Sequence, residues 1–197
     1  MGNIFGRMTQ AQNKASDNEL AEAAKTNPDM FGELVKRYQE RLFRYVRRIS
    51  YFSNEDIEDI VQEVFIKAYR SLNIFDNEYK FSTWIYQITR NATIDAIRKK
   101  QVRPKTVSID EDDAVKLFRS EINIQSQFET KERIEAIRKI ITSLPYKYRE
   151  VMVLRFLEDK DYAEIVEIVQ KPRGTVAALI SRGKTLFSTE AQKNGLL

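Results

Sequence analysis

The sequence predicts an all-α protein of two small helical domains joined by a flexible acidic linker, the C-terminal domain containing a helix-turn-helix. Only 6 glycines and 4 prolines occur among 197 residues, and few segments alternate polar and apolar residues with the period of a strand. Hydrophobic residues make up 42% of the chain and charged residues 31%, a balance that suits two small cores better than one large core.

Charge divides the chain more sharply than hydropathy does. Residues 54–63 hold five acids and no base, whereas residues 80–105 hold seven bases and one acid. Residues 108–132 are acidic again, and residues 171–193 hold five bases and one acid. Two basic regions separated by an acidic one predict two contacts with anionic partners and a linker that avoids them, although solvated faces are the ordinary alternative.

The residue types exclude several chemistries. The chain has no cysteine and no histidine, which removes disulfides, thiolate nucleophiles, zinc knuckles, iron–sulfur sites and the usual general base. The longest apolar run covers residues 176–180, far short of the roughly 20 residues that span a bilayer, and no signal-peptide core precedes the first helix. We therefore expect a cytoplasmic protein without cofactor, metal or membrane insertion.

Apolar residues at helical spacing predict four helices in the first half of the chain. These helices cover residues 17–25, 29–49, 54–72 and 82–100. A serine stands before or at the start of three of them, at Ser16, Ser53 and Ser82, where its hydroxyl can cap the helix. Asp56 stands where the acid of a capping box stands.

The third of these helices predicts an acidic surface. When its apolar stripe is buried, Asp56, Asp59, Gln62 and Glu63 face outward, which suits a basic protein partner rather than DNA. Paired carboxylates at this spacing can also bind a divalent metal, as in a nuclease, but no third cluster of ligands accompanies them.

The fourth helix predicts a surface for single-stranded nucleic acid. At about 100° per residue, one stripe is apolar, and Trp84, Gln87, Asn91 and Arg98 share another face with Arg90 at its margin. An aromatic ring can stack an unpaired base, while the amide and guanidinium groups bind base edges and phosphates. The alternative is that Trp84 packs against a neighbouring helix and the basic end complements the helix dipole.

Near the C-terminus the sequence predicts a helix-turn-helix. Helices are expected over 148–157, 162–169 and 174–187, with Asp161 as a cap and residues 170–172 as the turn. Few residues on the outer face of the last helix can make bidentate base contacts, so phosphate contacts should supply most of the affinity for DNA. An ordinary helical hairpin is the alternative.

Taken together, the three surfaces resemble those of the sigma-70 family of bacterial transcription initiation factors, and specifically its compact extracytoplasmic-function (ECF) group. The segments that carry the resemblance are residues 54–70, 81–91, 144–151 and 162–176. The first two motifs are specific, because the acidic helix with Gln62 and Glu63 is followed at the family's interval by Phe81-Ser82-Thr83-Trp84.

The resemblance implies roles for individual residues. Residues that would dock on the clamp of core RNA polymerase are Asp56, Asp59, Gln62, Glu63 and Phe65. Residues that would hold the melted minus-ten strand or grip upstream phosphates are Phe75, Asn77, Lys80, Trp84, Tyr86, Gln87, Arg90, Asn91, Arg98 and Lys99. Residues that would contact the minus-thirty-five element are Arg149, Arg173, Thr175, Ala178, Ser181, Arg182 and Lys184.

The resemblance also implies a division of the chain. A disordered tail over 1–16 would precede a region 2 domain over 17–103, a linker over 104–130, a region 4 domain over 131–188 and a tail over 189–197. The linker would thread through the polymerase, whose clamp and flap would bind the two domains. Promoter DNA and an anti-sigma protein are the other partners that the group implies.

The C-terminal match departs from the family pattern. Family members usually carry a small residue where this chain has Val166, glycine where it has Gln170, and an apolar residue where it has Lys171. They usually carry basic residues where this chain has Ala177 and Leu179. These departures put the turn geometry and ordinary minus-thirty-five recognition in question, so an unusual or weakly read element, or a protein contact in its place, stays open.

The resemblance therefore implies a sigma factor that makes RNA polymerase promoter-specific and is not itself an enzyme. Two rival hypotheses come from other classes: a helical adaptor or anti-factor that binds only proteins, and a stand-alone helix-turn-helix repressor that binds duplex DNA without polymerase.

Overall fold

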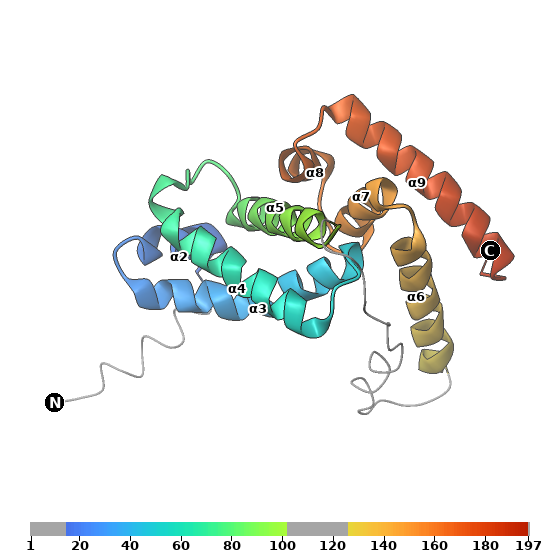
Figure 1. Ribbon diagram of the computed structural model, residues 1–197, viewed down its shortest axis with the longest axis horizontal. Helices are drawn as coiled ribbons and strands as arrows, with labels where there is room; N and C mark the ends of the chain where they lie inside the picture. The colour runs from blue at the N-terminus through green and yellow to red at the C-terminus, as the bar shows by residue number, and fades with distance from the viewer. Residues whose placement is uncertain (1–14, 102–125, 197) are drawn as a thin grey trace.

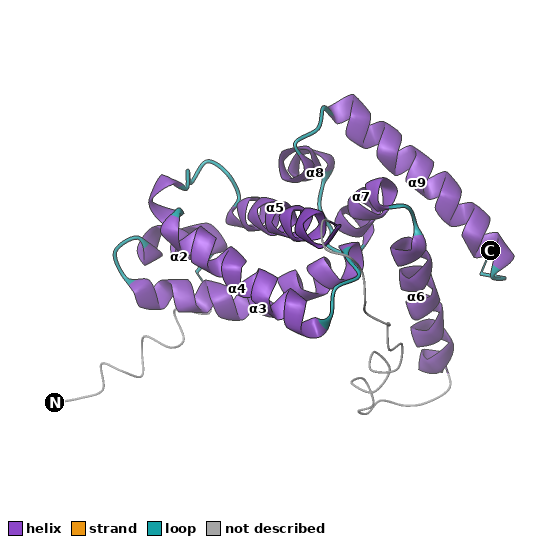
Figure 2. Ribbon diagram, in the orientation of Figure 1, coloured by secondary structure: helices purple, strands orange, loops and turns teal. Residues whose placement is uncertain are grey.

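The computed structural model describes residues 15–101 and 126–196, and it describes side chains over 15–100 and 134–196 (Figure 1). Within these ranges the chain forms α-helices and one short 3-10 helix, η1 (Leu72–Ile74), and no strand (Figure 2). The α-helices are α2 (Asp17–Ala24), α3 (Pro28–Ile49), α4 (Asn54–Arg70), α5 (Phe81–Gln101), α6 (Ser126–Ser143), α7 (Tyr146–Phe156), α8 (Tyr162–Val169) and α9 (Arg173–Lys193). The predicted all-α class is confirmed.

The N-terminal unit, α2–α5, forms around apolar stripes at helical spacing. Leu34, Leu42 and Ile49 of α3 are almost completely buried and pack in one cluster with Ile57 of α4 and Ile85 of α5. Each such side chain contributes about 1.5 to 3 kcal/mol when it is removed from water. Burial of this stripe leaves the opposite face of α4 and one side of α5 toward solvent.

Local capping starts three of the helices as predicted. The Ser16 hydroxyl accepts the backbone N–H of Glu19, and the Ser53 hydroxyl accepts that of Asp56 at 3.3 Å. The Asp161 carboxylate accepts the backbone N–H of Glu164 at the start of α8, and the Glu164 carboxylate accepts the backbone N–H of Asp161. Each motif satisfies backbone donors that the first turn of a helix leaves without intrahelical partners.

The prediction that Ser82 caps the fourth helix is wrong. Helix α5 begins at Phe81, whose backbone N–H donates to the side-chain oxygen of Asn18 at 2.9 Å. The Ser82 hydroxyl instead accepts a hydrogen bond from the ammonium of Lys160 at 3.0 Å. A tertiary contact from α2 therefore replaces the local cap.

The C-terminal unit, α6–α9, contains the predicted helix-turn-helix in α8 and α9. Helix α6 was not predicted, α7 begins two residues before the expected start, and α9 continues to Lys193. Ile165, Val176 and Ile180 join α8 and α9 through a buried apolar cluster. The predicted linker over 104–130 lies outside the described residues up to 125, and residues 126–130 belong to α6.

The turn between α8 and α9 keeps a left-handed backbone without glycine. Gln170 has φ 53° and ψ 48°, the conformation that a residue with a Cβ adopts at a cost of about 1 to 2 kcal/mol. Lys171 is exposed at the position where the family carries an apolar residue. The missing glycine therefore adds strain to the turn without removing its left-handed geometry.

Candidate nucleic-acid interface

Aromatic side chains from the start of α5 and from the loop before it form a cluster. The Trp84 ring lies 5.0 Å from Phe75 and 5.7 Å from Phe81, measured between ring centroids, and it is half-buried. Phe75 is itself buried, at 4% exposure. The sequence-predicted strand-binding residues Phe75 and Trp84 are thus adjacent, with Phe75 supporting the tryptophan from below the surface.

Asn18 of α2 holds the loop that presents these residues. Its amide nitrogen donates to the backbone oxygens of Asn77 at 3.1 Å and Tyr79 at 2.8 Å, while its oxygen caps α5. Lys25 adds a hydrogen bond to the Phe75 carbonyl at 3.3 Å. Sequence reasoning missed Asn18, because its partners lie 59 to 63 residues away and no local pattern marks them.

The other predicted strand-binding residues differ in exposure. The side chains that reach solvent are Asn77, Lys80, Asn91, Arg98 and Lys99. Gln87 and Arg90 are half-buried, and Tyr86 is fully buried. Burial and the nearby Glu158 carboxylate raise the pKa of Tyr86 far above its usual range, so the phenol stays protonated and donates to that carboxylate at 2.5 Å.

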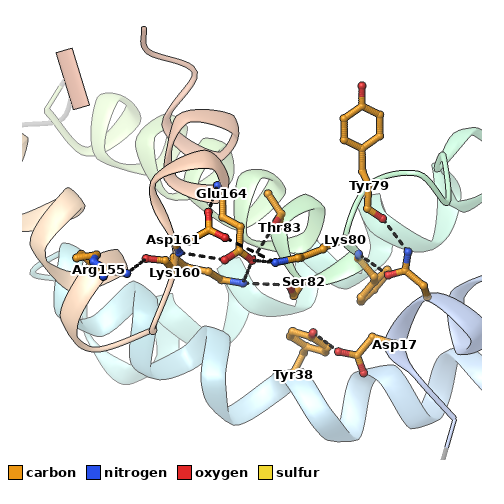
Figure 3. A network of polar contacts seen from close by, with 12 residues as sticks. Asp17, Tyr38, Tyr79, Lys80, Ser82, Thr83, Arg155, Lys160, Asp161 and Glu164 are labelled. Carbon is orange, nitrogen blue, oxygen red and sulfur yellow. Dashed lines mark hydrogen bonds and ion pairs between the residues drawn. The ribbon is translucent and has the colours of Figure 1, made fainter. Parts of the chain in front are cut away.

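Acids of the C-terminal unit meet the bases of α5 and its preceding loop. The Arg90 guanidinium donates to Glu150 at 2.6 Å, and Lys80 lies 3.6 Å from Glu164. Figure 3 shows Glu164 on α8 reaching toward Lys80 and Thr83. Burial disfavours the charged form of Arg90, but the Glu150 carboxylate, together with Tyr146 and Tyr45, outweighs it and raises the pKa of the guanidinium.

A buried lysine lies at the same junction. The Lys160 ammonium, at 4% residue exposure, contacts the Ser82 hydroxyl at 3.0 Å and the Glu164 carboxylate at 3.2 Å. Burial lowers the pKa of Lys160, and the Glu164 charge opposes that shift. Ionic and hydroxyl groups from both units thus satisfy one another across this contact.

The acidic face of α4 has the exposure expected of a protein-binding surface. Asp59, Gln62 and Glu63 reach solvent, and Asp56 is half-buried, with its carboxylate 2.5 Å from the Lys100 ammonium. That hydrogen bond is the largest of the effects that lower the pKa of Asp56. Over the side chains described, no three metal-ligating residues lie close enough to hold an ion.

An apolar groove between α3 and α4 borders this face. Phe65 is buried and meets Phe31 edge to face at 6.4 Å, whereas Ile66 and Tyr69 are 45% and 46% exposed. Gln62 also lines this groove. Sequence reasoning missed Ile66 and Tyr69, although their place one turn from Gln62 and Phe65 could have signalled them.

The outer face of α9 presents most of the predicted duplex-binding residues. The exposed residues of this set are Arg173, Thr175, Ala178, Ser181, Arg182 and Lys184. Arg149 does not lie with them: it is 4% exposed, donates to the Leu144 carbonyl at 3.0 Å and stacks over the Tyr51 ring at 4.5 Å. The structure therefore separates Arg149 from the other members of the predicted set, because α7 packs this side chain inward.

Comparison with known proteins identifies both units. Residues 34–103 match the family model Sigma-70 region 2, and residues 134–186 match Sigma-70, region 4. The chain is 33% identical over 173 residues to the ECF RNA polymerase sigma factor SigW of Bacillus subtilis, covering 84% of this chain and 90% of the relative. The chain belongs to the ECF sigma factors of the sigma-70 family.

A second relative and two solved structures agree with this assignment. The ECF sigma factor is 31% identical over 183 residues to the ECF RNA polymerase sigma-E factor of Escherichia coli, with 90% and 95% of the two chains covered. The structure of CnrH in complex with the cytosolic domain of CnrY has a TM-score of 0.65 at 23% identity, covering 91% and 99% of the chains. The sigma factor RpoE bound to the anti-sigma factor NepR from Bartonella quintana has a TM-score of 0.59 at 18% identity, covering 81% and 94%. These two likenesses show a shared fold.

None of the helices in the described ranges is both long enough and apolar enough to cross a membrane.

Proposed function

We propose that this ECF sigma factor binds core RNA polymerase, directs it to specific promoters and assists opening of the duplex. The observation that carries the proposal is the combination, on one chain, of sigma-70 regions 2 and 4 with an aromatic and basic face on α5 and an exposed outer face on α9. The polymerase supplies the chemistry, and we assign no catalytic residue, cofactor or metal to the sigma factor. We place it in the cytoplasm, where the polymerase works.

The polymerase-binding surface is assigned to α4 and the adjoining groove. Asp56, Asp59, Gln62 and Glu63 provide a polar and acidic face on α4. Gln62 and Phe65 also line the apolar groove beside this face. Aromatic and aliphatic anchors within a polar rim are the arrangement that carries most of the affinity in protein interfaces. The clamp of the polymerase is the proposed partner of this surface.

The melted minus-ten strand is assigned to α5 and its preceding loop. Stacking of a base on an aromatic ring such as Trp84 contributes about 1 to 3 kcal/mol, which is comparable to the few kcal/mol that unstacking a base requires. Asn77, Lys80, Gln87, Arg90 and Asn91 would bind base edges and phosphates, with Phe75 and Tyr86 as supports. Arg98 and Lys99, exposed at the end of α5, would hold upstream phosphates.

The minus-thirty-five element is assigned to α9. Arg173 at its N-terminus and Ser181 and Lys184 on its outer face would enter the major groove, and Thr175, Ala178 and Arg182 flank them. With few bidentate donors available, phosphate contacts would supply most of the affinity. Arg149 is then a structural support for α7 rather than a contact to DNA.

We propose that the chain consists of two functional domains joined by a linker. Residues 17–103 would bind the polymerase clamp and the minus-ten strand, and residues 131–188 would bind the polymerase flap and the minus-thirty-five element. Residues 104–130 would form the linker between them. An anti-sigma protein is the further proposed partner. It is supported by the likeness in fold to an RpoE chain solved with its anti-sigma factor.

Run-off transcription tests the proposal. Purified protein is added to core polymerase on a genomic DNA library, and promoter-specific transcripts are expected. Duplex binding without transcripts would favour a stand-alone repressor, and the absence of any dependence on nucleic acid would favour an adaptor.

A narrower test uses Trp84→Ala with Trp84→Phe as the conservative control. Trp84→Ala is expected to lower promoter opening by about tenfold, because it removes a stacking surface, while polymerase binding changes little. Trp84→Phe should restore much of the opening. Equal loss of opening and of polymerase binding in Trp84→Ala would contradict the assignment of this residue.

A further inference from the structure

The loop before α5, residues 75–80, is tied to α2 through its backbone. The amide nitrogen of Asn18 donates to the backbone oxygens of Asn77 at 3.1 Å and Tyr79 at 2.8 Å. The ammonium of Lys25, the residue that caps the end of α2, donates to the Phe75 carbonyl at 3.3 Å. Three carbonyls of the loop are thus bound to one neighbouring helix and its cap.

Side-chain packing does little to place this loop. Residues 76–80 are all exposed, so they bury little apolar surface. The Asp76 carbonyl accepts the Tyr79 N–H at 3.1 Å, which shapes a turn but does not attach it to another element. The Lys80 ammonium lies 3.6 Å from Glu164 of α8, a contact at the end of a long side chain rather than at the backbone. The position of the loop backbone therefore depends mainly on the hydrogen bonds from α2.

Asn18 fixes two elements because it uses both ends of its amide. While the nitrogen holds two carbonyls of the loop, the oxygen accepts the backbone N–H of Phe81, the first residue of α5, at 2.9 Å. An asparagine amide has two N–H donors and one acceptor, whereas an aspartate of the same shape has only acceptors. One side chain thereby holds the loop and the start of α5 in a fixed relation.

The helix that carries Asn18 is itself firmly attached. The neighbouring Asp17 carboxylate accepts hydrogen bonds from Arg37 at 2.8 Å and from the Tyr38 hydroxyl, both on α3; Figure 3 shows the second of these bonds. Burial and the Asp17 carboxylate raise the pKa of Tyr38 far above its usual range, so the phenol stays protonated and donates. Leu20 of α2 is 2% exposed and belongs to the core. The loop is thus tied to a part of the molecule that does not move easily.

The loop and the start of α5 carry residues assigned above to the melted strand. Asn77 is exposed in the loop, and the Trp84 ring on α5 lies 5.0 Å from the ring of Phe75. Because Asn77 and Trp84 come from different elements, neither element alone sets the spacing between them. A site that is arranged before its ligand arrives avoids the cost of ordering the loop on binding, and its fixed spacing favours one ligand geometry over others.

We propose that Asn18 is a positioning residue for minus-ten recognition. It fixes the loop against α5 and so sets the arrangement in which Asn77 and Trp84 meet the melted strand, without touching DNA itself. Lys25 supports the same loop through a single bond and has the smaller share. The proposal rests on the function proposed above, because it requires that the loop and α5 bind the strand.

The variant Asn18→Asp separates positioning of the loop from capping of α5. Its carboxylate keeps an oxygen for the Phe81 N–H, but it puts a second acceptor against the carbonyls of Asn77 and Tyr79. The variant is assembled with core polymerase on a promoter recovered by the run-off test, and permanganate reactivity of the unpaired thymines measures opening. Opening should fall about tenfold, because the apparent Kd for the strand is inversely proportional to the fraction of molecules with an ordered loop. Binding to core polymerase should be unchanged.

The matched control is Ala23→Asp, which adds the same charge at an exposed position of the same helix. It should change opening less than about twofold, because salt screens an exposed charge. Equal losses of opening in Asn18→Asp and Ala23→Asp would overturn the proposal, as would native opening in Asn18→Asp.

Base preference provides a measurement that a loss of folded protein does not alter. The bases of the melted segment are changed one at a time, and run-off yield is measured with the native factor and with Asn18→Asp. The least favourable change should lower the yield about tenfold with the native factor and less than about threefold with the variant, because a loop that is free to move accommodates several bases. Partial unfolding would instead lower every yield by one factor. Unchanged ratios between the bases would therefore count against the positioning role.

Trp84 reports on the loop directly, because it is the single tryptophan of the chain. Acrylamide should quench its fluorescence more strongly in Asn18→Asp than in the native protein or Ala23→Asp, since the loop no longer holds Phe75 against the ring. Quenching equal to that of the native protein would contradict the proposal.

A second variant keeps the test decisive if circular dichroism shows that Asn18→Asp is not folded. Lys25→Met removes only the donor to the Phe75 carbonyl from the loop, and it should lower opening about threefold; no change would then overturn the proposal. Transcripts from the native factor together with unchanged opening in the variants would refute only the positioning role. The absence of transcripts from the native factor would refute the sigma function itself.

Discussion

The N-terminal unit, α2–α5, buries mainly large apolar and aromatic side chains, whereas the C-terminal unit, α6–α9, also buries charged groups. Tyr38, Leu34 and Phe81 are among the largest fully buried side chains of the first unit. Arg149, Glu150 and Lys160 are the charged residues that are buried among the described side chains, and all three belong to the second unit. The buried apolar residues of both units belong to one cluster, and the difference is that the second unit also buries charged groups, some of which pair with partners from the first.

Leu34→Ala is expected to have the largest effect, because it tests the core of the N-terminal unit. Leu34 has no exposed surface, and truncation in such a site costs about 2 to 5 kcal/mol of the free energy of unfolding. Urea denaturation measures this loss, which should be nearly independent of salt. Ile74→Ala is the control, since Ile74 is 83% exposed and should change stability by less than about 0.5 kcal/mol. A similar small loss for both would show that the core is not as close-packed as described.

Arg149→Ala is expected to cost about 2 kcal/mol of stability, because it removes hydrogen bonds to Leu144 and Tyr51 within and between the units. The salt dependence of binding to promoter duplex should be unchanged in Arg149→Ala, because this residue makes no contact with phosphate. Lys184→Ala is the matched control: it should leave stability nearly unchanged and reduce the salt slope of binding by about 1. Thermal melting and binding titrations at several salt concentrations distinguish the two. A reduced slope for Arg149→Ala would return this residue to the DNA-binding set.

Acid should weaken the contact through Glu164, an effect smaller than that of either preceding substitution. Burial opposes ionisation of this carboxyl, but the Asp161 backbone N–H and the ammonium groups of Lys160 and Lys80 hold its pKa below the usual 4.5. A carboxyl with a lowered pKa stabilises the folded state above its unfolded pKa and loses this contribution as the pH falls through the folded value. The difference in unfolding free energy between the native sequence and Glu164→Gln should therefore shrink below about pH 4.5. A difference independent of pH would contradict this assignment.

Gln170→Gly is expected to have the smallest effect, a gain of about 0.5 to 1 kcal/mol. Glycine removes the steric cost of the left-handed conformation at φ 53°, and its extra freedom in the unfolded chain returns part of the gain. A rise in the melting temperature measures it. The same change at Lys171, the next residue of the turn and without a positive φ, serves as the control and should not stabilise the protein.

Much of the local structure was predictable because it depends on residues close together in the sequence. The caps at Ser16, Ser53 and Asp161 each involve partners three residues away, so the pattern alone predicts them. Ser82 was mistaken for a cap because its local pattern is the same, while Asn18 supplies the actual one from 63 residues away. Helix α6 was missed because the charges of residues 126–143 obscure its apolar spacing.

The candidate site was predictable to a similar extent. Helical spacing correctly indicated that Ser181 and Lys184 reach solvent on α9. The same reasoning could not indicate that Tyr86 and Arg149 are buried, because their partners are Glu158 and Tyr51, which belong to other elements. The roles of these residues in binding polymerase and DNA stay predictions.

The sequence by itself determined the helical class, the order of the acidic, aromatic and helix-turn-helix segments, and the family that these imply, because periodicity and composition act along the chain. Only the tertiary structure decided that Glu150, Glu158 and Glu164 meet the donors of the N-terminal unit. The acids and bases counted along the sequence could each have faced solvent. Their pairing follows from burial, since a charge that is removed from water requires a partner at hydrogen-bond distance, and only the packed fold brings that partner there.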